Sequence, residues 1–143
     1  MKRFLLSIIA LLTIFSSVAY SFDFHLLDKV NIEEVKSKAQ KGDAEAQCTL
    51  GSCFLEGHYI KKDVQKAMIW LHKSAEQECS DAQTLLGLVY YSGVYKEVPQ
   101  NMEKGKYWLR RAAKNGCKSA EAWLHCFEEH EKMEYAREQM IDY

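Results

Sequence analysis

The sequence predicts an all-α protein, and three observations lead to that prediction. The chain of 143 residues has only 7 glycines and 1 proline, whereas an all-β chain would need many turn residues. The chain repeats itself: Ala46 recurs 36 positions later as Ala82, for example. Within each repeat the apolar residues fall at helical spacing. Together these features predict one α/α solenoid of helical hairpins, each burying its apolar face against its neighbours.

Composition narrows the possible functions. The chain is 48% hydrophobic and 27% charged, which is the balance of an ordinary folded protein. Its 19 basic and 20 acidic residues give a net charge of −1, so we expect no nucleic-acid partner. The length suits one domain, which argues against the two-domain architectures common among enzymes.

Residues 1–21 have the order of regions found in a secretory signal peptide. Two basic residues precede an apolar stretch over residues 4–15, and small residues follow. We favour cleavage after Ser21, with Ala19 as the alternative and an uncleaved membrane anchor as a third interpretation. Cleavage predicts an exported chain, periplasmic or secreted, with no stable membrane insertion and with residues 22–34 as a lead-in.

The repeat region spans residues 35–131. Two copies cover 44–79 and 80–117, and a partial third begins at 118. Matching pairs are Ala46 and Ala82, Gln47 and Gln83, Leu50 and Leu86, Gly51 and Gly87, Gly57 and Gly93, and then Ala67 and Gly105, Trp70 and Trp108, Leu71 and Leu109, Ala75 and Ala113, Cys79 and Cys117. The second set is shifted by 38 instead of 36, which places a two-residue insertion in a loop of the second copy.

Each copy predicts a first and a second helix. The first helix runs over about 44–56 and ends at Gly57, because glycine tolerates the left-handed conformation that closes a helix. Asp63 and Asn101 are expected to cap the second helices. Residues 35–42 are expected to end an earlier second helix, so the solenoid starts with a half-unit.

The tryptophans and other aromatic residues of the repeats are expected in the core. Trp70 and Trp108 lie at matching positions of the second helices, and Phe54 and Tyr90 at matching positions of the first. Each is expected to face the partner helix, where the repeat fixes its position. An exposed aromatic platform is the alternative.

The C-terminal end is predicted to cap the solenoid. Polar residues stand where the earlier copies have glycine, an aromatic residue and glycine: His125, Glu128 and Glu131. No helix breaker occurs over 119–141, so we expect one long helix, with residues 132–143 as its terminal part. Terminal repeats need such a polar outer face.

These motifs resemble the Sel-one-like repeat, a relative of the tetratricopeptide repeat. Small, glycine and aromatic positions all fall in register, although Tyr59 stands where the family usually has a second loop glycine. The resemblance implies a non-enzymatic module that binds a protein or peptide in a groove built from successive first helices. An exported adaptor or scaffold that acts in the envelope or on a host is the expected role.

The cysteine-rich members of that family suggest an alternative, a cell-wall or β-lactam hydrolase. Those members carry cysteine pairs eight residues apart, whereas this chain has Ala75 with Gln83 and Ala113 with Glu121 at these positions. The chain also has no Ser-x-x-Lys and no Lys-Thr-Gly motif. We therefore expect no catalytic residues and no cofactor.

Five cysteines in an exported chain predict at least one disulfide, and the odd number leaves one cysteine over. Cys48 with Cys79 is the first choice, because both lie towards the open end of one hairpin. Cys117 with Cys126 is the alternative. Cys117, Cys126 and His130 also suggest zinc ligands, but their spacing matches no recognised site, and no metal is expected.

The binding surface is predicted from the faces of the first helix. Ala46, Leu50 and Phe54 point to one side, so the opposite side is expected to meet the partner. That surface comprises Ser52, Leu55 and Glu56, their counterparts Leu88, Tyr91 and Ser92, and the loop residues His58, Tyr59 and Tyr95 at one rim. The alternative is that a neighbouring unit or the cap covers these side chains.

Overall fold

The structure, a computed structural model, describes residues 31–141, and within this range it consists of helices joined by loops and turns. The helices are α2 (Ile32–Gln40), α3 (Ala44–Glu56), α4 (Val64–Glu76), α5 (Ser80–Ser92), α6 (Met102–Lys114) and α7 (Lys118–Ile141). The predicted signal peptide and most of the predicted lead-in lie outside the described residues. No helix within the described range is long and apolar enough to span a bilayer.

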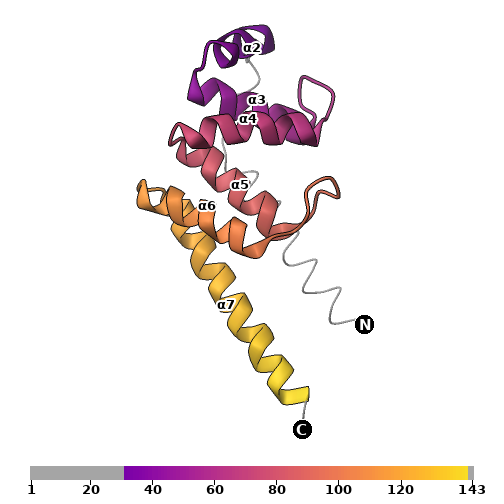
Figure 1. The fold of residues 1–143 in the computed structure, drawn as a ribbon, viewed down its shortest axis with the longest axis vertical. Coiled ribbons are helices and arrows are strands. Elements are labelled where there is room, and N and C mark those ends of the chain that lie inside the picture. Colours follow the sequence, from indigo (N-terminus) through magenta and orange to yellow (C-terminus); the bar gives the residue numbers. More distant parts are fainter. Residues whose placement is uncertain (1–30, 142–143) are drawn as a thin grey trace. The chain divides into compact units, whose positions relative to one another are not determined.

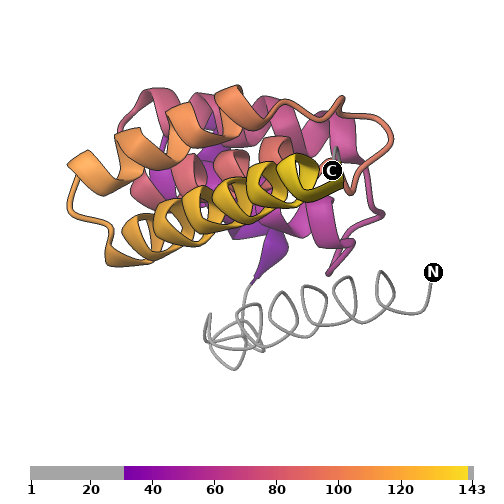
Figure 2. The same cartoon turned by 90° about the horizontal axis from the view of Figure 1, so that it is seen from below.

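The helices stack in chain order, as Figure 1 shows. α3 pairs with α4 and α5 with α6, and these two hairpins are the most extensive contacts between elements. α5 packs on α4, and α7 packs on α6 in the same way. From below, the first helices α3, α5 and α7 form one layer, and the second helices α4 and α6 form the other (Figure 2). The predicted α/α solenoid is confirmed.

The predicted helix ends are also confirmed. α3 ends at Gly57, whose φ of 80° is left-handed, and the Gly57 amide donates to the Cys53 carbonyl. The Asp63 carboxylate accepts the Lys66 amide at 3.0 Å at the start of α4. Asn101 caps α6 through the corresponding bond at 2.9 Å.

Small residues bring the paired helices into close contact. A Cβ atom on Gly87 would lie 2.5 Å from Cγ of Leu109, and one on Gly105 would lie 2.8 Å from the carbonyl oxygen of Gly87. In the first hairpin Gly51 packs in the same way on Leu71, but Ala67 stands in the place of Gly105. The second hairpin therefore depends on two glycines, and the first depends on one.

The core follows the repeat positions. Its largest fully buried apolar side chains are Leu50, Leu71, Leu86 and Leu109. Trp108 is buried as predicted, with 6% of its surface exposed. Trp70 is only half-buried, and the Lys73 ammonium lies 4.6 Å from the centre of its ring. The prediction that both tryptophans are fully covered is thus wrong for Trp70, because only the short α2 lies beyond it.

In each repeat one buried glutamine forms a hydrogen bond to the helix before it. The Gln47 side chain donates to the Ala39 carbonyl at 3.1 Å, and Gln83 donates to the Ala75 carbonyl at 3.0 Å. Ala39 and Ala75 are repeat equivalents, so α2 occupies the place of a second helix. The predicted N-terminal half-unit is confirmed.

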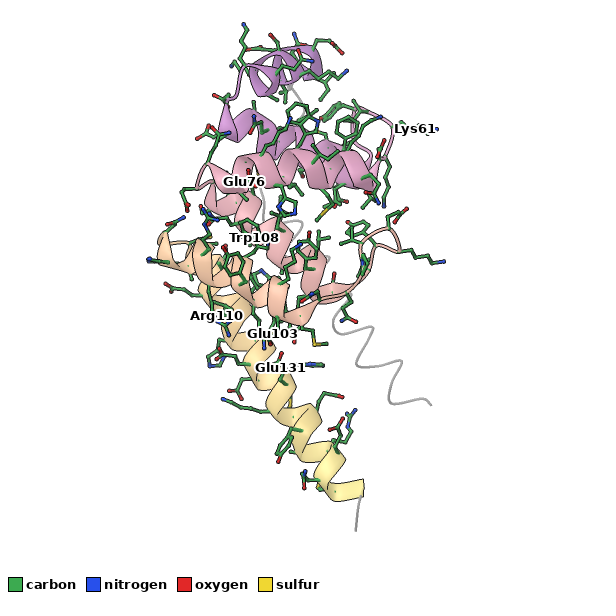
Figure 3. The ribbon with its side chains drawn as sticks, in the orientation of Figure 1. Lys61, Glu76, Glu103, Trp108, Arg110 and Glu131 are labelled. Carbon is green, nitrogen blue, oxygen red and sulfur yellow. The ribbon has the colours of Figure 1, made fainter. Side chains whose placement is uncertain are left out.

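α7 is attached to α6 through its first half. The buried Lys106 ammonium binds Glu103 on its own helix at 2.6 Å and Glu131 on α7 at 3.0 Å; Figure 3 labels both carboxylates. Beyond Glu131 the side chains up to Met140 are exposed. α7 is therefore the long, polar capping helix that the sequence predicts.

Candidate functional site

α5 leaves one narrow strip of its surface open. After its first residue, every side chain of the helix is buried except Asp81, which is exposed, and Leu85, Leu88 and Ser92, which are half-buried. At 100° per residue these four side chains fall within an arc of about 60°. The rest of the helix is covered because α4 packs on one side and α6 on another.

The other first helices carry the same strip. The repeat equivalents are Glu45, Thr49, Ser52 and Glu56 on α3, and Ser119, Trp123, Cys126 and His130 on α7, all of them exposed or half-buried. Because α3, α5 and α7 form one layer, the three strips lie on a common side, which we name the first-helix face. It consists of these eight residues and the four from α5.

The first-helix face has an apolar centre and acidic ends. Leu88 of α5 and Trp123 of α7 are half-buried and pack against the same buried cluster, so both helices contribute an apolar side chain to this face. Leu85 lies one turn before Leu88. Glu45 and Asp81 stand at the N-terminal ends of their helices, and Glu56 stands at the opposite end of α3.

The predicted binding residues divide into two groups. Four lie on the first-helix face: Ser52, Glu56, Leu88 and Ser92. Leu55 and Tyr91 are 3% and 8% exposed, so the prediction that they are available to a partner is wrong. The Tyr91 ring stacks on Phe127 of α7 at 3.5 Å between ring centres. The physical reason is that each first helix meets two neighbours, so the side opposite one of them is not free.

Sequence reasoning missed several residues of the face. They are Glu45, Thr49, Asp81, Leu85, Ser119 and Trp123, as well as Cys126, which was considered as a disulfide partner or metal ligand, and His130, which was considered as a metal ligand. Leu85 and Trp123 are large and apolar, so composition alone assigns them to the core. A helical wheel that reserves one arc for each of the two neighbouring helices would have identified them.

The predicted rim residues are placed differently from one another. His58 and Tyr59 are exposed in the loop after α3, and Tyr59 has the left-handed φ of 61°. Tyr95 is half-buried against the core, and its burial raises the pKa of the phenol to about 12. The Lys62 ammonium lies 5.0 Å from the centre of the Tyr95 ring. Tyr95 therefore acts first as a packing residue.

The five cysteines are all free thiols in the structure. Cys117 and Cys126 lie nine residues apart at the start and in the body of α7, which places their Cα atoms about 13 Å apart. The limit for a disulfide is about 7 Å, so this alternative pairing is wrong. Cys79 packs against the buried cluster that contains Cys48, and their disulfide stays a prediction.

The alternative of a zinc site has no cluster of ligands in the described range. Over residues 31–141 no three His, Cys, Asp or Glu side chains lie close enough together to hold a metal ion. Cys126 and His130 both belong to the first-helix face instead.

Known protein families identify the repeat. A model of the Sel1 repeat matches residues 44–79 and 80–117, which together make up just over half of the chain. The secretory immunoglobulin A-binding protein EsiB of Escherichia coli is 40% identical over 48 residues, which are 34% of this chain and 10% of EsiB. A putative sel1-like repeat-containing protein of Acanthamoeba polyphaga mimivirus is 47% identical over 45 residues, or 32% of this chain and 8% of that protein. The chain thus spans about a tenth or less of these two relatives.

Solved structures share the fold. A protective antigen of uropathogenic Escherichia coli strains, which displays an SLR fold, superposes with a TM-score of 0.63 and 38% identity. The match covers 67% of this chain and 20% of the antigen. A Sel1 repeat protein from Oxalobacter formigenes superposes with a TM-score of 0.62 and 30% identity, covering 70% of this chain and 74% of that protein.

Proposed function

Because the chain belongs to the Sel1 repeat family, we propose that it is a non-enzymatic module that binds a segment of a partner protein across its first-helix face. The Sel1 repeat family mediates protein–protein interaction. The residues that the repeat does not fix are the ones that distinguish one member from another. On this chain they include Leu85, Leu88 and Trp123.

The observation that carries the proposal is the exposed apolar centre of this face. α5 buries its other large apolar side chains, but Leu85 and Leu88 stay half-exposed one turn apart, and Trp123 of α7 packs against the same buried cluster as Leu88. A continuous apolar patch bordered by polar groups is typical of a binding surface. Glu45 and Asp81 at its edge favour a partner segment with basic residues next to its apolar ones.

We also propose that the chain acts outside the cytoplasm, as a periplasmic or secreted adaptor. The order of charged, apolar and small residues over 1–21 supports export. Two of the similar proteins are a secretory immunoglobulin A-binding protein and a protective antigen of a pathogen. The chain matches only short parts of those proteins, so their partners are not assigned to it.

A peptide library tests the binding proposal directly. The chain is immobilised and used to select peptides from a random library, and the selected peptides are measured against two double variants. Leu85→Ser with Leu88→Ser removes the apolar centre of the face. Ile69→Ser with Tyr107→Ser changes two exposed apolar residues of the second helices and serves as the matched control.

We expect peptides rich in apolar and basic residues, at least tenfold weaker binding to the Leu85/Leu88 variant, and unchanged binding to the control. Circular dichroism checks that both variants keep their helicity. Equal loss in both variants, or binding that depends only on Ile69 and Tyr107, would place the binding surface on the second helices and contradict the proposal.

Export is tested by the N-terminus of the mature protein. The full chain is expressed in a bacterium, the periplasmic fraction is collected, and the recovered protein is sequenced from its N-terminus. We expect the sequence to begin at Phe22. Recovery of the chain only from the cytoplasm, with its first residues intact, would contradict the proposal.

A further inference from the structure

Two cysteines lie at the junction between the first repeat and the second. Cys48 lies in the second turn of α3 and is 8% exposed, and Cys79 is the half-buried residue that precedes α5. Cys79 packs against the buried cluster to which Cys48 belongs. The repeat equivalents of these two residues, Thr84 and Cys117, approach to 3.6 Å between oxygen and sulfur, which indicates that the two thiols are close although they are far apart in sequence. We name them the Cys48–Cys79 pair.

Polar contacts on both sides hold this pair in place. The Ser74 hydroxyl donates to the Ala44 carbonyl at 2.6 Å. The Gln77 amide donates to the Gln47 side chain at 2.7 Å. One end of each contact lies within four residues of Cys48 and the other within five of Cys79, so the corner between α4 and α5 is fixed against the start of α3.

The two thiols are chemically different. The hydrogen bond from Cys48, together with the amides of Ala82 and Asp81 at the start of α5, lowers the pKa of Cys79 to about 5. Ser74 also lies near this sulfur, but its proton is already donated to Ala44. The interaction with Cys79 and burial raise the pKa of Cys48. Cys79 is therefore the member of the pair that loses its proton more readily, and the thiolate is the nucleophilic form of a cysteine.

We propose that the Cys48–Cys79 pair is a thiol–disulfide exchange site, in which Cys79 attacks a small disulfide of the glutathione type and Cys48 completes the exchange. Cys79 is the more accessible member of the pair, and Cys48 belongs to the buried cluster against which Cys79 packs. This is the arrangement that a nucleophilic and a resolving cysteine need.

The exchange balances in two steps. The Cys79 thiolate attacks one sulfur of oxidised glutathione, the disulfide bond of glutathione breaks, and one glutathione thiolate leaves with the electron pair. Cys48 then gives up its proton to solvent and attacks the Cys79 sulfur, which releases the second glutathione thiolate. The two cysteine thiols are oxidised to one disulfide, and one oxidised glutathione is reduced to two thiols.

The next junction supplies a natural control within the same chain. Thr84 occupies the repeat position of Cys48, and its hydroxyl lies 3.6 Å from the sulfur of Cys117, the equivalent of Cys79. The pKa of Cys117 is also lowered, through hydrogen bonds from Ser119, the Ala120 amide and Thr84 that outweigh its burial. A threonine cannot resolve a mixed disulfide, so Cys117 is expected to stop at the glutathione adduct.

The test uses the full chain, reduced and then treated with oxidised glutathione, with intact mass and peptide mapping as readouts. We expect the wild type to form the Cys48–Cys79 disulfide and to release the glutathione bound at Cys79. Cys48→Ser should trap the adduct at Cys79, because serine keeps a hydrogen-bond donor but cannot resolve. Cys79→Ser should form neither product at this site.

Cys117 should keep its adduct in all three proteins. Alkylation by iodoacetamide at neutral pH should be faster at Cys79 than at the exposed Cys126 in the wild type. Circular dichroism identifies any variant that is unfolded, and Cys48→Ala then replaces Cys48→Ser. A stable glutathione adduct at Cys79 in the wild type, or reaction at Cys79 no faster than at the exposed Cys126, would overturn the proposal.

Discussion

At the first junction Cys48 faces Cys79, whereas at the second junction Thr84 faces Cys117 at 3.6 Å. One polar contact beside them is the same. Gln77 donates to Gln47 at 2.7 Å in the first junction, and Asn115 donates to Gln83 at 3.2 Å in the second. The repeat therefore fixes where side chains meet, and single substitutions decide which chemistry occurs there.

The corner residue before each pair differs as well. Gly42 and Gly116 have the left-handed φ values of 97° and 84° at equivalent corners, and Glu78 has a φ of 64° at the corner between α4 and α5. A side chain at this conformation is strained, but the Glu78 carboxylate binds Arg111 and Asn115 of the next hairpin. Glu78 thus has a strained backbone conformation, and its side chain forms a contact between repeats.

The largest expected effect is the difference in stability loss when each of the two tryptophans is replaced by alanine. Trp108→Ala should lower the free energy of unfolding by about 3 to 5 kcal/mol, because a large buried side chain leaves a cavity. Trp70→Ala should cost clearly less, since its ring is half-exposed. Urea denaturation of both variants measures the difference. Equal losses of stability would mean that the two tryptophans are buried to the same extent.

Trp108→Phe sharpens this prediction. The Trp108 indole N–H is buried and has no hydrogen-bond partner among the described residues. Phenylalanine therefore loses volume but no hydrogen bond, and it should recover most of the stability that alanine removes. A loss as large as that of alanine would show that the N–H is satisfied.

The second prediction concerns a variant that gives the second junction the cysteine pair of the first junction. Thr84→Cys places a thiol against Cys117, and oxidation should raise the free energy of unfolding by about 2 to 4 kcal/mol over the reduced variant. Urea denaturation with and without a reductant measures the gain. Thr84→Ser, which cannot form a disulfide, is the control. If Thr84→Cys forms no bond to Cys117, the two junctions differ in geometry as well as in chemistry.

The third prediction exchanges a small residue between the hairpins. Gly105→Ala introduces the residue that Ala67 supplies in the first hairpin, but its Cβ would lie 2.8 Å from the Gly87 carbonyl oxygen and from the Tyr91 amide nitrogen. Backbone atoms cannot move aside as a side chain can, so we expect a loss of about 1 to 3 kcal/mol by urea denaturation. Ala67→Gly is the reciprocal control. An unchanged denaturation midpoint for Gly105→Ala would show that the second hairpin accommodates a methyl group at this position as readily as the first.

The fold could be predicted from the sequence because its signals are local. Helical spacing, the caps at Asp63 and Asn101 and the glycine at the end of α3 each act within a few residues. The first-helix face depends on two neighbouring helices at once, which is why Leu55 and Tyr91 were assigned to it and Leu85 was not. The bond between Glu78 and Arg111 depends on a side-chain distance that no periodicity contains.

The smallest expected effect concerns Glu78 and pH. Hydrogen bonds from Arg111, Asn115 and Gln83 lower the pKa of Glu78 from its ordinary value of 4.5 to about 2. Because the folded-state pKa is depressed, the stabilisation is complete above about pH 5 and is lost as the pH falls through 4.5 towards 2. The gain is small, since the carboxylate is exposed to solvent.

Thermal melts of the wild type and Glu78→Gln between pH 7 and pH 3 should therefore converge as the pH falls, with the wild type more stable only at the upper end. Glu129→Gln, which removes a carboxylate paired only with Lys132 on the same helix, controls for the loss of a surface charge. Glu78→Gly separates strain from pairing, because glycine relieves the left-handed backbone but removes the carboxylate. If Glu78→Gly is more stable than the wild type at pH 7, the backbone strain outweighs the contact between repeats, and the corner at Glu78 costs the fold more than the corners at Gly42 and Gly116.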